Sequence, residues 1–146
     1  RTDLLRHWVQ DLGRTLDYIE QHPDLRSNAT SYLGLSLGAV VAPNLLAFEP
    51  RFRALVLYSG GFGVASSQAS IDAQSGLAAR VSAPVLLLVG DEDIVSPVEP
   101  HKTAFLGAFG SPDSAKVMRV FDAGHWPLPM NDVIRETVDF LDRFGG

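Results

Sequence analysis

Hydrophobic residues recur in two periods along this chain, and the two periods predict alternating helices and strands. Short apolar runs at residues 30–35, 54–58, 85–89 and 117–121 predict four strands. A helix precedes the first strand, because apolar residues there lie three or four positions apart: Leu5, Trp8, Val9, Leu12, Leu16 and Ile19. A helix is also predicted after each strand: the first ends near residue 48, the second spans 71–79 and the third spans 96–109. The last closes the chain and carries the apolar residues Val133, Ile134, Val138, Leu141 and Phe144.

Strands that alternate with helices indicate an α/β fold, with a mostly parallel sheet of about four strands and helices on both faces. The run at residues 85–89 is apolar throughout, which is typical of a strand buried on both faces. Sheets of this class bind ligands outside the carboxyl ends of their strands. Residues that directly follow the strands are therefore the first candidates for a functional site.

Residues 96–99 predict how the helix over 96–109 begins. Ser96 and Glu99 have the spacing of a capping box, and Pro97 stands at the first helical position. We therefore expect one continuous helix from Ser96 to about Phe109.

Composition and charge narrow the class of protein. The 146 residues are 46% hydrophobic and 20% charged, which suits a single soluble domain over residues 1–146. A net charge of −5 without a basic cluster argues against a nucleic-acid partner, and the longest apolar stretch is too interrupted for a membrane partner. The chain has no cysteine, so disulfides and thiolate metal sites are excluded. The compartment stays undetermined, with a soluble cytoplasmic protein as our expectation.

The most informative stretch is residues 34–38, Gly-Leu-Ser-Leu-Gly, which joins the first predicted strand to the helix after it. This is the G-x-S-x-G pattern in a strand–turn–helix context. Such a corner strains the backbone of Ser36, and a Cβ at Gly34 or Gly38 would collide with the neighbouring strand or the helix start. In return, the Ser36 hydroxyl stands clear of the backbone beside the amides of a helix N-terminus.

Two other strand ends supply what an activated serine needs. A serine hydroxyl becomes an effective nucleophile when a base takes its proton, and a carboxylate orients an imidazole for that task. Asp91 and Asp93 follow the third predicted strand, and His125 follows the fourth. The pattern therefore places a serine, two acids and a histidine on one rim of the sheet.

Three segments carry a resemblance to a known family: residues 34–38, residues 90–97 (Gly-Asp-Glu-Asp-Ile-Val-Ser-Pro) and residues 121–125 (Phe-Asp-Ala-Gly-His). In the order serine, acid, histidine, they resemble the α/β-hydrolase superfamily, in particular its dienelactone-hydrolase-like and small-esterase members. The resemblance extends over nearly the whole chain. It implies an α/β-hydrolase fold and an acid at Asp93.

The residues themselves leave some assignments open. Asp91 lies nearest the strand and is an alternative acid to Asp93, although it would equally suit a turn cap, and Asp122 is expected in a turn. Trp126 is expected either to bind substrate by lining an acyl pocket or to pack under the loop of His125. The remaining histidines show no metal-ligand spacing, and we expect neither a metal nor another cofactor.

The start of the chain raises the question of what completes the fold. In the family, one oxyanion donor is the amide after the nucleophile, here Leu37, and the second comes from a loop upstream of the nucleophile strand. The chain begins at Arg1, already in the first helix. The resemblance thus covers the C-terminal half of a truncated fold that lacks the N-terminal strands, and we expect a fragment of a longer protein. Either upstream sequence or a second chain would cover the apolar edge of the first strand, and we expect a homodimer.

These observations favour a serine hydrolase, most simply a carboxylesterase that cleaves short-chain acyl esters through an acyl-enzyme on Ser36. His125 would act as base and then as acid, Asp93 would orient it, and the Leu37 amide would hold part of the oxyanion. The partner would be a small-molecule ester. The alternatives are an inactive hydrolase-like docking module of a larger protein, and a peptidase or thioesterase with the same residues.

Overall fold

A parallel β-sheet forms the centre of the structure. The computed structural model describes residues 2–146, and within them four strands form one sheet: β1 (Tyr32–Leu35), β2 (Leu55–Tyr58), β3 (Val85–Gly90) and β4 (Lys116–Phe121). All neighbouring strands pair in parallel, in the order β1-β2-β3-β4. The predicted parallel sheet of about four strands is confirmed. Because the strands are parallel, their carboxyl ends lie on one rim.

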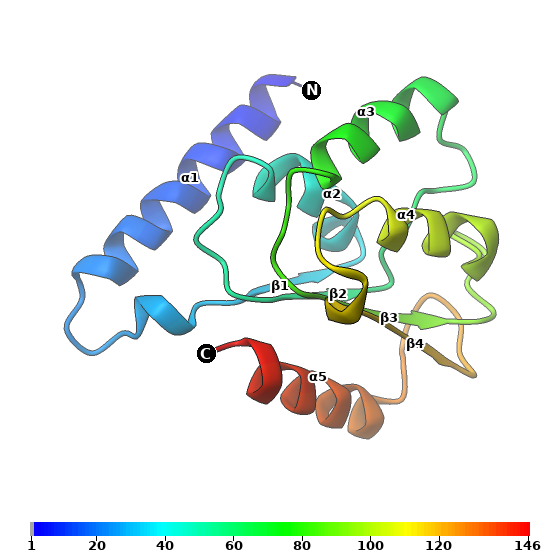
Figure 1. Cartoon of the computed structure of the whole chain (residues 1–146). Helices are drawn as coiled ribbons and strands as arrows, with labels where there is room; N and C mark the ends of the chain where they lie inside the picture. The colour runs from blue at the N-terminus through cyan, green and yellow to red at the C-terminus, as the bar shows by residue number, and fades with distance from the viewer. Residues whose placement is uncertain (1) are drawn as a thin grey trace.

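Helices cover both faces of the sheet (Figure 1). The first four α-helices lie on one face and the last lies on the other. Within residues 2–146 the α-helices are α1 (Thr2–Gln21), α2 (Leu37–Leu46), α3 (Gln68–Ala78), α4 (Thr103–Gly107) and α5 (Met130–Phe144). Each overlaps a segment for which the hydrophobic pattern predicts a helix.

Side chains of β3 alternate between the two faces of the sheet, which explains its unbroken apolar sequence. Leu87 lies in a core with Phe105 of α4, whereas Leu86 and Leu88 pack against Phe140 of α5. All of the residues of β3 are buried. A strand enclosed by helices on both sides needs apolar residues at every position, and this interpretation of the sequence is confirmed.

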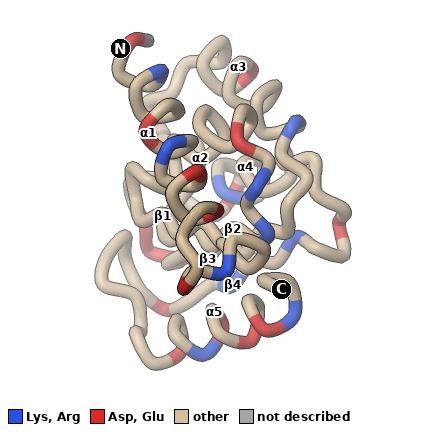
Figure 2. The backbone as a smooth tube through the Cα atoms, turned by 90° about the vertical axis from the view of Figure 1, so that its left-hand side faces the viewer, with Lys and Arg blue, Asp and Glu red and all other residues tan. Residues whose placement is uncertain are grey.

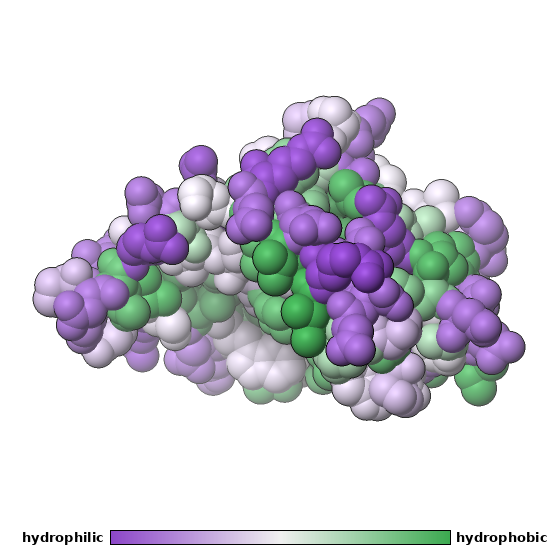
Figure 3. Space-filling view, turned by 90° about the horizontal axis from the view of Figure 1, so that it is seen from below, coloured by the Kyte–Doolittle hydropathy of each residue, from purple (hydrophilic) through white to green (hydrophobic). Residues whose placement is uncertain are grey.

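Strand β1 lies at an edge of the sheet, and one of its faces is open. Leu33 and Leu35 are in register with Val56 and Tyr58 of β2, whose side chains pack on the α5 side. Leu33 is 58% exposed and Leu35 is 43% exposed. Seen from the α5 side, apolar side chains reach the surface among polar ones (Figure 3). Helix α5 thus leaves the β1 end of this face uncovered.

The segment between β3 and α4 differs from the predicted continuous helix. A π-helical turn, η2 (Val98–Lys102), precedes α4, and Glu99 within it is extended, with φ −107° and ψ 135°. The predicted capping box does not form, because the Ser96 hydroxyl donates to the carbonyl of Phe62 instead. Pro100 explains the break in the helix, since the residue before a proline avoids the α conformation.

The surface carries charges of both signs. Lys and Arg are interspersed with Asp and Glu along the chain (Figure 2), and on α5 Arg135 pairs with Asp132 at 2.8 Å. None of the helices within residues 2–146 is long and apolar enough to cross a membrane.

Candidate active site

Ser36 lies at the corner between β1 and α2, at the carboxyl end of its strand. Its backbone has φ 50° and ψ −108°, a strained conformation that costs a non-glycine residue about 1–3 kcal/mol. The position just before the first turn of α2 places Ser36 beside helix amides, whose dipole favours a developing negative charge. The strained corner expected from the sequence is confirmed.

The two glycines around this corner differ in the space that is available for a side chain. A Cβ at Gly34 would lie 2.7 Å from the carbonyl carbon of Gly38 and 2.8 Å from the amide nitrogen of Ala39, so no side chain fits there. A Cβ at Gly38 would meet the Tyr32 hydroxyl at 3.8 Å, which is an ordinary contact. The expected collision is therefore confirmed at Gly34 and wrong at Gly38. The reason is that Tyr32, which donates to the Gly38 carbonyl at 2.8 Å, leaves room on that side.

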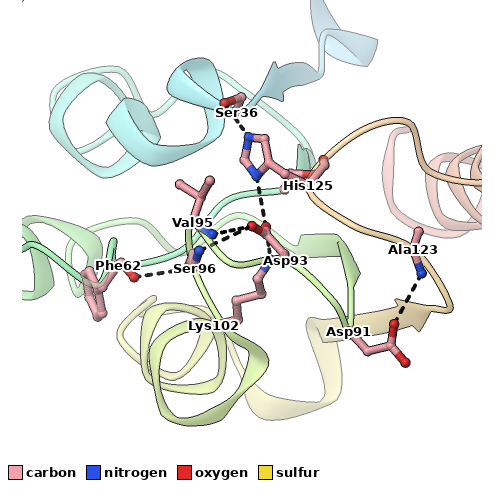
Figure 4. Close-up of polar contacts among 10 residues, drawn as sticks. Ser36, Phe62, Asp91, Asp93, Val95, Ser96, Lys102, Ala123 and His125 are labelled. Carbon is pink, nitrogen blue, oxygen red and sulfur yellow. Dashed lines mark hydrogen bonds and ion pairs between the residues drawn. The ribbon is translucent and has the colours of Figure 1, made fainter.

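A hydrogen-bonded chain connects Ser36 to residues at two other strand ends (Figure 4). Ser36 Oγ lies 2.8 Å from Nε2 of His125, and Nδ1 of His125 lies 2.9 Å from Oδ2 of Asp93. An ionised carboxylate only accepts hydrogen bonds. Nδ1 therefore carries the ring proton of the neutral imidazole, and Nε2 accepts from the Ser36 hydroxyl. General-base activation of a serine requires an arrangement of this kind.

Asp93 sits in the loop after β3 and is 2% exposed. Its Oδ1 accepts from the amides of Val95 (2.9 Å) and Ser96 (3.3 Å), and its Oδ2 accepts from Lys102 Nζ (2.5 Å) as well as from His125. Burial alone raises the pKa of Asp93, but the hydrogen bonds from Lys102 and His125 outweigh it and hold that pKa below its usual range. The carboxylate is therefore ionised at neutral pH.

The other two acids considered in the sequence lie in different surroundings. Asp91 is exposed, and its Oδ1 accepts from the amide of Ala123 at 3.2 Å. This bond ties the loop after β3 to the loop after β4. Asp122 is also exposed. The carboxylate that the structure brings to His125 is that of Asp93.

Two residues beside the hydrogen-bonded chain are not apparent from the sequence. Lys102 of η2 is fully buried and pairs with Asp93, although a lysine in a predicted helix is expected to face solvent. Ser59 follows β2, has a φ of 51°, and donates from Oγ to the backbone carbonyl of His125 at 2.7 Å. The available signals are weak: a polar residue at a strand end for Ser59, and a helix interrupted by Pro100 for Lys102.

Leu37 and Trp126 flank this group of residues. Leu37 is the first residue of α2, and amides in the first turn of a helix have no acceptor within their own helix. Trp126 directly follows His125, and its side chain is 52% exposed. The roles expected for Leu37 in the oxyanion hole and for Trp126 in substrate binding stay predictions.

Clusters of metal ligands are not found in the described part of the chain. Among residues 2–146, no three His, Cys, Asp or Glu side chains are grouped so that they could hold a metal ion. The expectation that the protein uses neither a metal nor another cofactor stays a prediction.

No protein-family model and no curated protein matches this chain significantly. Solved structures do match it. A zinc-bound, cold-adapted esterase from an Arctic intertidal metagenomic library has a TM-score of 0.73 and 25% identity, over 92% of this chain and 56% of that one. A dienelactone-hydrolase-like protein from Klebsiella pneumoniae has a TM-score of 0.72 and 18% identity, over 92% and 60%. Acetyl xylan esterase 1 from Thermoanaerobacterium has a TM-score of 0.69 and 21% identity, over 94% and 52%.

The chain has the α/β-hydrolase fold. It spans about half the length of these solved structures, as expected of a truncated α/β-hydrolase fold. Within this fold, Ser36, Asp93 and His125 follow β1, β3 and β4, so all three lie at the rim where the parallel strands end.

Proposed function

We propose that this chain carries the nucleophile, base and acid of a serine esterase that hydrolyses short-chain carboxylic esters. One observation carries the proposal, the unbroken path from Ser36 Oγ through His125 to Asp93 with spacings of 2.8 and 2.9 Å. Two of the solved structures with this fold, a cold-adapted esterase and an acetyl xylan esterase, act in the same broad class by name. Their names support the class of reaction, whereas the assignment of Ser36, His125 and Asp93 rests on the geometry of this chain.

In the first half of the proposed reaction, Ser36 Oγ attacks the acyl carbon of the ester while its proton passes to Nε2 of His125. The new carbon–oxygen bond gives a tetrahedral intermediate, whose oxyanion is held in part by the Leu37 amide at the start of α2. When the intermediate collapses, the bond to the alcohol breaks and His125 gives its proton to the leaving oxygen. Asp93 stays ionised and stabilises the imidazolium.

In the second half, water takes the place of the alcohol. His125 accepts a proton from the water as the water oxygen attacks the acyl carbon. The bond from that carbon to Ser36 Oγ then breaks, and the proton on His125 returns to the serine oxygen. The carboxylic acid leaves, and the free hydroxyl of Ser36 is restored.

We assign the acyl part of a small ester to a groove that begins at Leu37, the residue after Ser36. It has a volume of about 470 Å³ and lies between α1, α2 and α3. Its walls combine apolar and polar side chains, as small-molecule sites do; they include Leu4, Trp8, Leu37, Val41, Ser70 and Gln74. Leu37 links the groove to the serine corner. We assign Trp126, half exposed beside His125, as a further contact for the substrate.

The variant Ser36→Ala tests the proposal. It should lose hydrolysis of a short aryl ester by roughly 10⁴-fold or more, because the nucleophile is gone, while circular dichroism shows an intact fold. Ser82→Ala is the matched control, since Ser82 is an exposed serine that precedes β3 and so lies at the opposite end of the strands. It should keep wild-type activity. Activity retained in Ser36→Ala contradicts the proposal.

A docking module within a larger protein is the second candidate, and the uncovered face of β1 favours it. A fluorophosphonate probe separates the two candidates, because only an activated serine reacts with it. Labelling of the wild type but not of Ser36→Ala supports the enzyme, and labelling of neither supports the module. A panel of ester, thioester and peptide substrates then distinguishes an esterase from a thioesterase or peptidase with the same residues.

A further inference from the structure

Lys102 is a buried cation next to the proposed active site. It is 0% exposed, and its Nζ lies 2.5 Å from Oδ2 of Asp93. Moving an ammonium group from water into a protein interior is costly, and a paired carboxylate offsets that cost only in part. The reaction steps described above make no use of this group, so its presence there needs another explanation.

Lys102 and His125 donate to the same carboxylate oxygen (Figure 4). Oδ2 of Asp93 is 2.5 Å from Lys102 Nζ and 2.9 Å from His125 Nδ1. The other oxygen, Oδ1, accepts from the backbone amides of Val95 and Ser96. These donors together fix the plane of the Asp93 carboxylate. Among them, Lys102 is the one that forms an ion pair with Asp93 through an ammonium group.

The stem of Lys102 is packed as closely as its charged end. A Cβ at Gly61, in the loop after β2, would lie 3.1 Å from Lys102 Cγ and would collide with Ser96 Oγ. The Ser96 hydroxyl in turn donates to the carbonyl of Phe62 at 3.0 Å. The side chain of Lys102 is thereby confined between the loops after β2 and β3, and its ammonium is held at Oδ2 of Asp93.

The other ionisable groups around this pair are partly or fully exposed. Residues 59–63, in the loop after β2, contain none. Those of η2 and of the loops after β3 and β4 are exposed or half-buried: Asp91, Glu92, Glu99, His101 and Asp122. Water and salt screen such groups strongly. Lys102 is therefore the cation that acts on Asp93 and His125 with the least screening.

We propose that Lys102 is a positioning residue of the esterase site, which holds Oδ2 of Asp93 toward His125 and sets the pH range over which His125 works as a base. This inference rests on the proposed function. A carboxylate paired with an ammonium stabilises an imidazolium less than an unpaired carboxylate does, because the two charges partly cancel. Lys102 thus weakens the stabilisation that Asp93 gives to an imidazolium at His125.

Lys102→Met tests the inference, because it removes the charge and keeps most of the length of the side chain. The pH dependence of kcat/KM for a short aryl ester reports the ionisation of the free enzyme. We expect the midpoint of its acidic limb to rise by about one pH unit, since a charge this close shifts a neighbouring group by at least that much. Lys116→Met is the matched control, because Lys116 also pairs with an aspartate, Asp113 at 3.3 Å, but one that is 99% exposed. Its midpoint should equal that of the wild type.

Lys102→Gln is the second variant, neutral but still able to donate a hydrogen bond to Asp93, and it should show the same rise. A uniform loss of activity with an unchanged midpoint would overturn the inference, because Lys102 would then have a structural role alone. Failure of both variants to fold would overturn it for the same reason. If the wild type hydrolyses the ester but the midpoints of the variants are unchanged, only this inference fails and the proposed esterase function stands. If the wild type is inactive, the proposed function and this inference both fail.

Discussion

The backbone carbonyl of His125 accepts a 2.7 Å hydrogen bond from the hydroxyl of Ser59. Ser59 follows β2 and His125 follows β4, so the bond joins two strand ends that are 66 residues apart in the chain. Ser59 is buried, and its φ of 51° is strained for any residue except glycine. The bond anchors the loop that carries the imidazole. Ser59 thus positions His125 without contacting its ring nitrogens.

Ser59→Gly should lower kcat/KM for a short aryl ester by about five- to tenfold, because a buried hydrogen bond contributes about 1 kcal/mol. Glycine adopts a positive φ without strain, so the melting temperature should change little. Ser59→Ala loses the same bond and keeps the strain, so it should show a similar loss of activity and a lower melting temperature. Ester assays and thermal denaturation check both variants. Wild-type kcat/KM in Ser59→Gly contradicts the assigned role.

The features predicted correctly from the sequence are those that local pattern determines. The corner at Ser36 follows from an apolar strand, a glycine and a helix in immediate succession. The burial of β3 follows from its unbroken apolar run. The rule that parallel strands end on the same rim brings Asp91, Asp93 and His125 together, and the resemblance to the α/β-hydrolases favours Asp93 over Asp91. No long-range packing has to be known for any of these.

Lys102 and Ser59 escape prediction because contacts between distant loops decide what they do. The segment around Lys102 has the spacing of an amphipathic helix, in which a lysine belongs on the solvated face. Its burial depends on Gly61 in another loop and on the carboxylate of Asp93. The partner of Ser59 likewise lies on the loop after β4. Such contacts leave no periodic trace in the sequence.

Gly34→Ala and Gly38→Ala form a matched pair of tests for the corner at Ser36. Gly34→Ala should destabilise the fold by about 1–3 kcal/mol or more, because its Cβ would lie 2.7 Å from a backbone carbon that has no room to move. Gly38→Ala should be neutral or stabilising by up to about 1 kcal/mol, since alanine has the higher helix propensity. Urea unfolding measures both. Equal destabilisation by the two substitutions would contradict the steric account.

An ion pair far from the site provides a test of stability against pH. Glu49 is buried, and its Oε2 lies 2.6 Å from Arg51 Nη2 while Arg51 also pairs with Asp17 at 2.7 Å. The hydrogen bonds from Arg51 outweigh burial and hold the pKa of Glu49 below its ordinary value of 4.5. A pKa that is lower in the folded chain than in the unfolded one adds stability above pH 4.5, and that stability is lost as the pH falls through the lowered value.

Glu49→Gln should therefore reduce the free energy of unfolding at neutral pH by about 1–3 kcal/mol, the contribution of hydrogen bonds to a charged group. The difference from the wild type should shrink as the pH falls from 4.5 through the lowered pKa of Glu49, because first the unfolded chain and then the folded one takes up a proton at this carboxylate. Urea unfolding at neutral and acidic pH measures it. A difference that is the same at both pH values would show that the charge of Glu49 plays no part.

The uncovered face of β1 predicts self-association of this chain. An edge strand offers unpaired backbone groups to a partner strand, and here the edge also carries Leu33 and Leu35, which are 58% and 43% exposed. A second copy related by a two-fold axis would pair β1 with its own equivalent and bring Leu33 and Leu35 beside the same residues of the partner strand. We expect a homodimer at micromolar concentration by light scattering.

Leu33→Lys should yield a monomer with an intact fold, because a charge on an edge strand opposes pairing. Ile134→Lys is the control, since Ile134 is as exposed, at 53%, but lies on α5. A monomeric wild type contradicts the prediction, and a dimer that persists in Leu33→Lys places the interface away from β1.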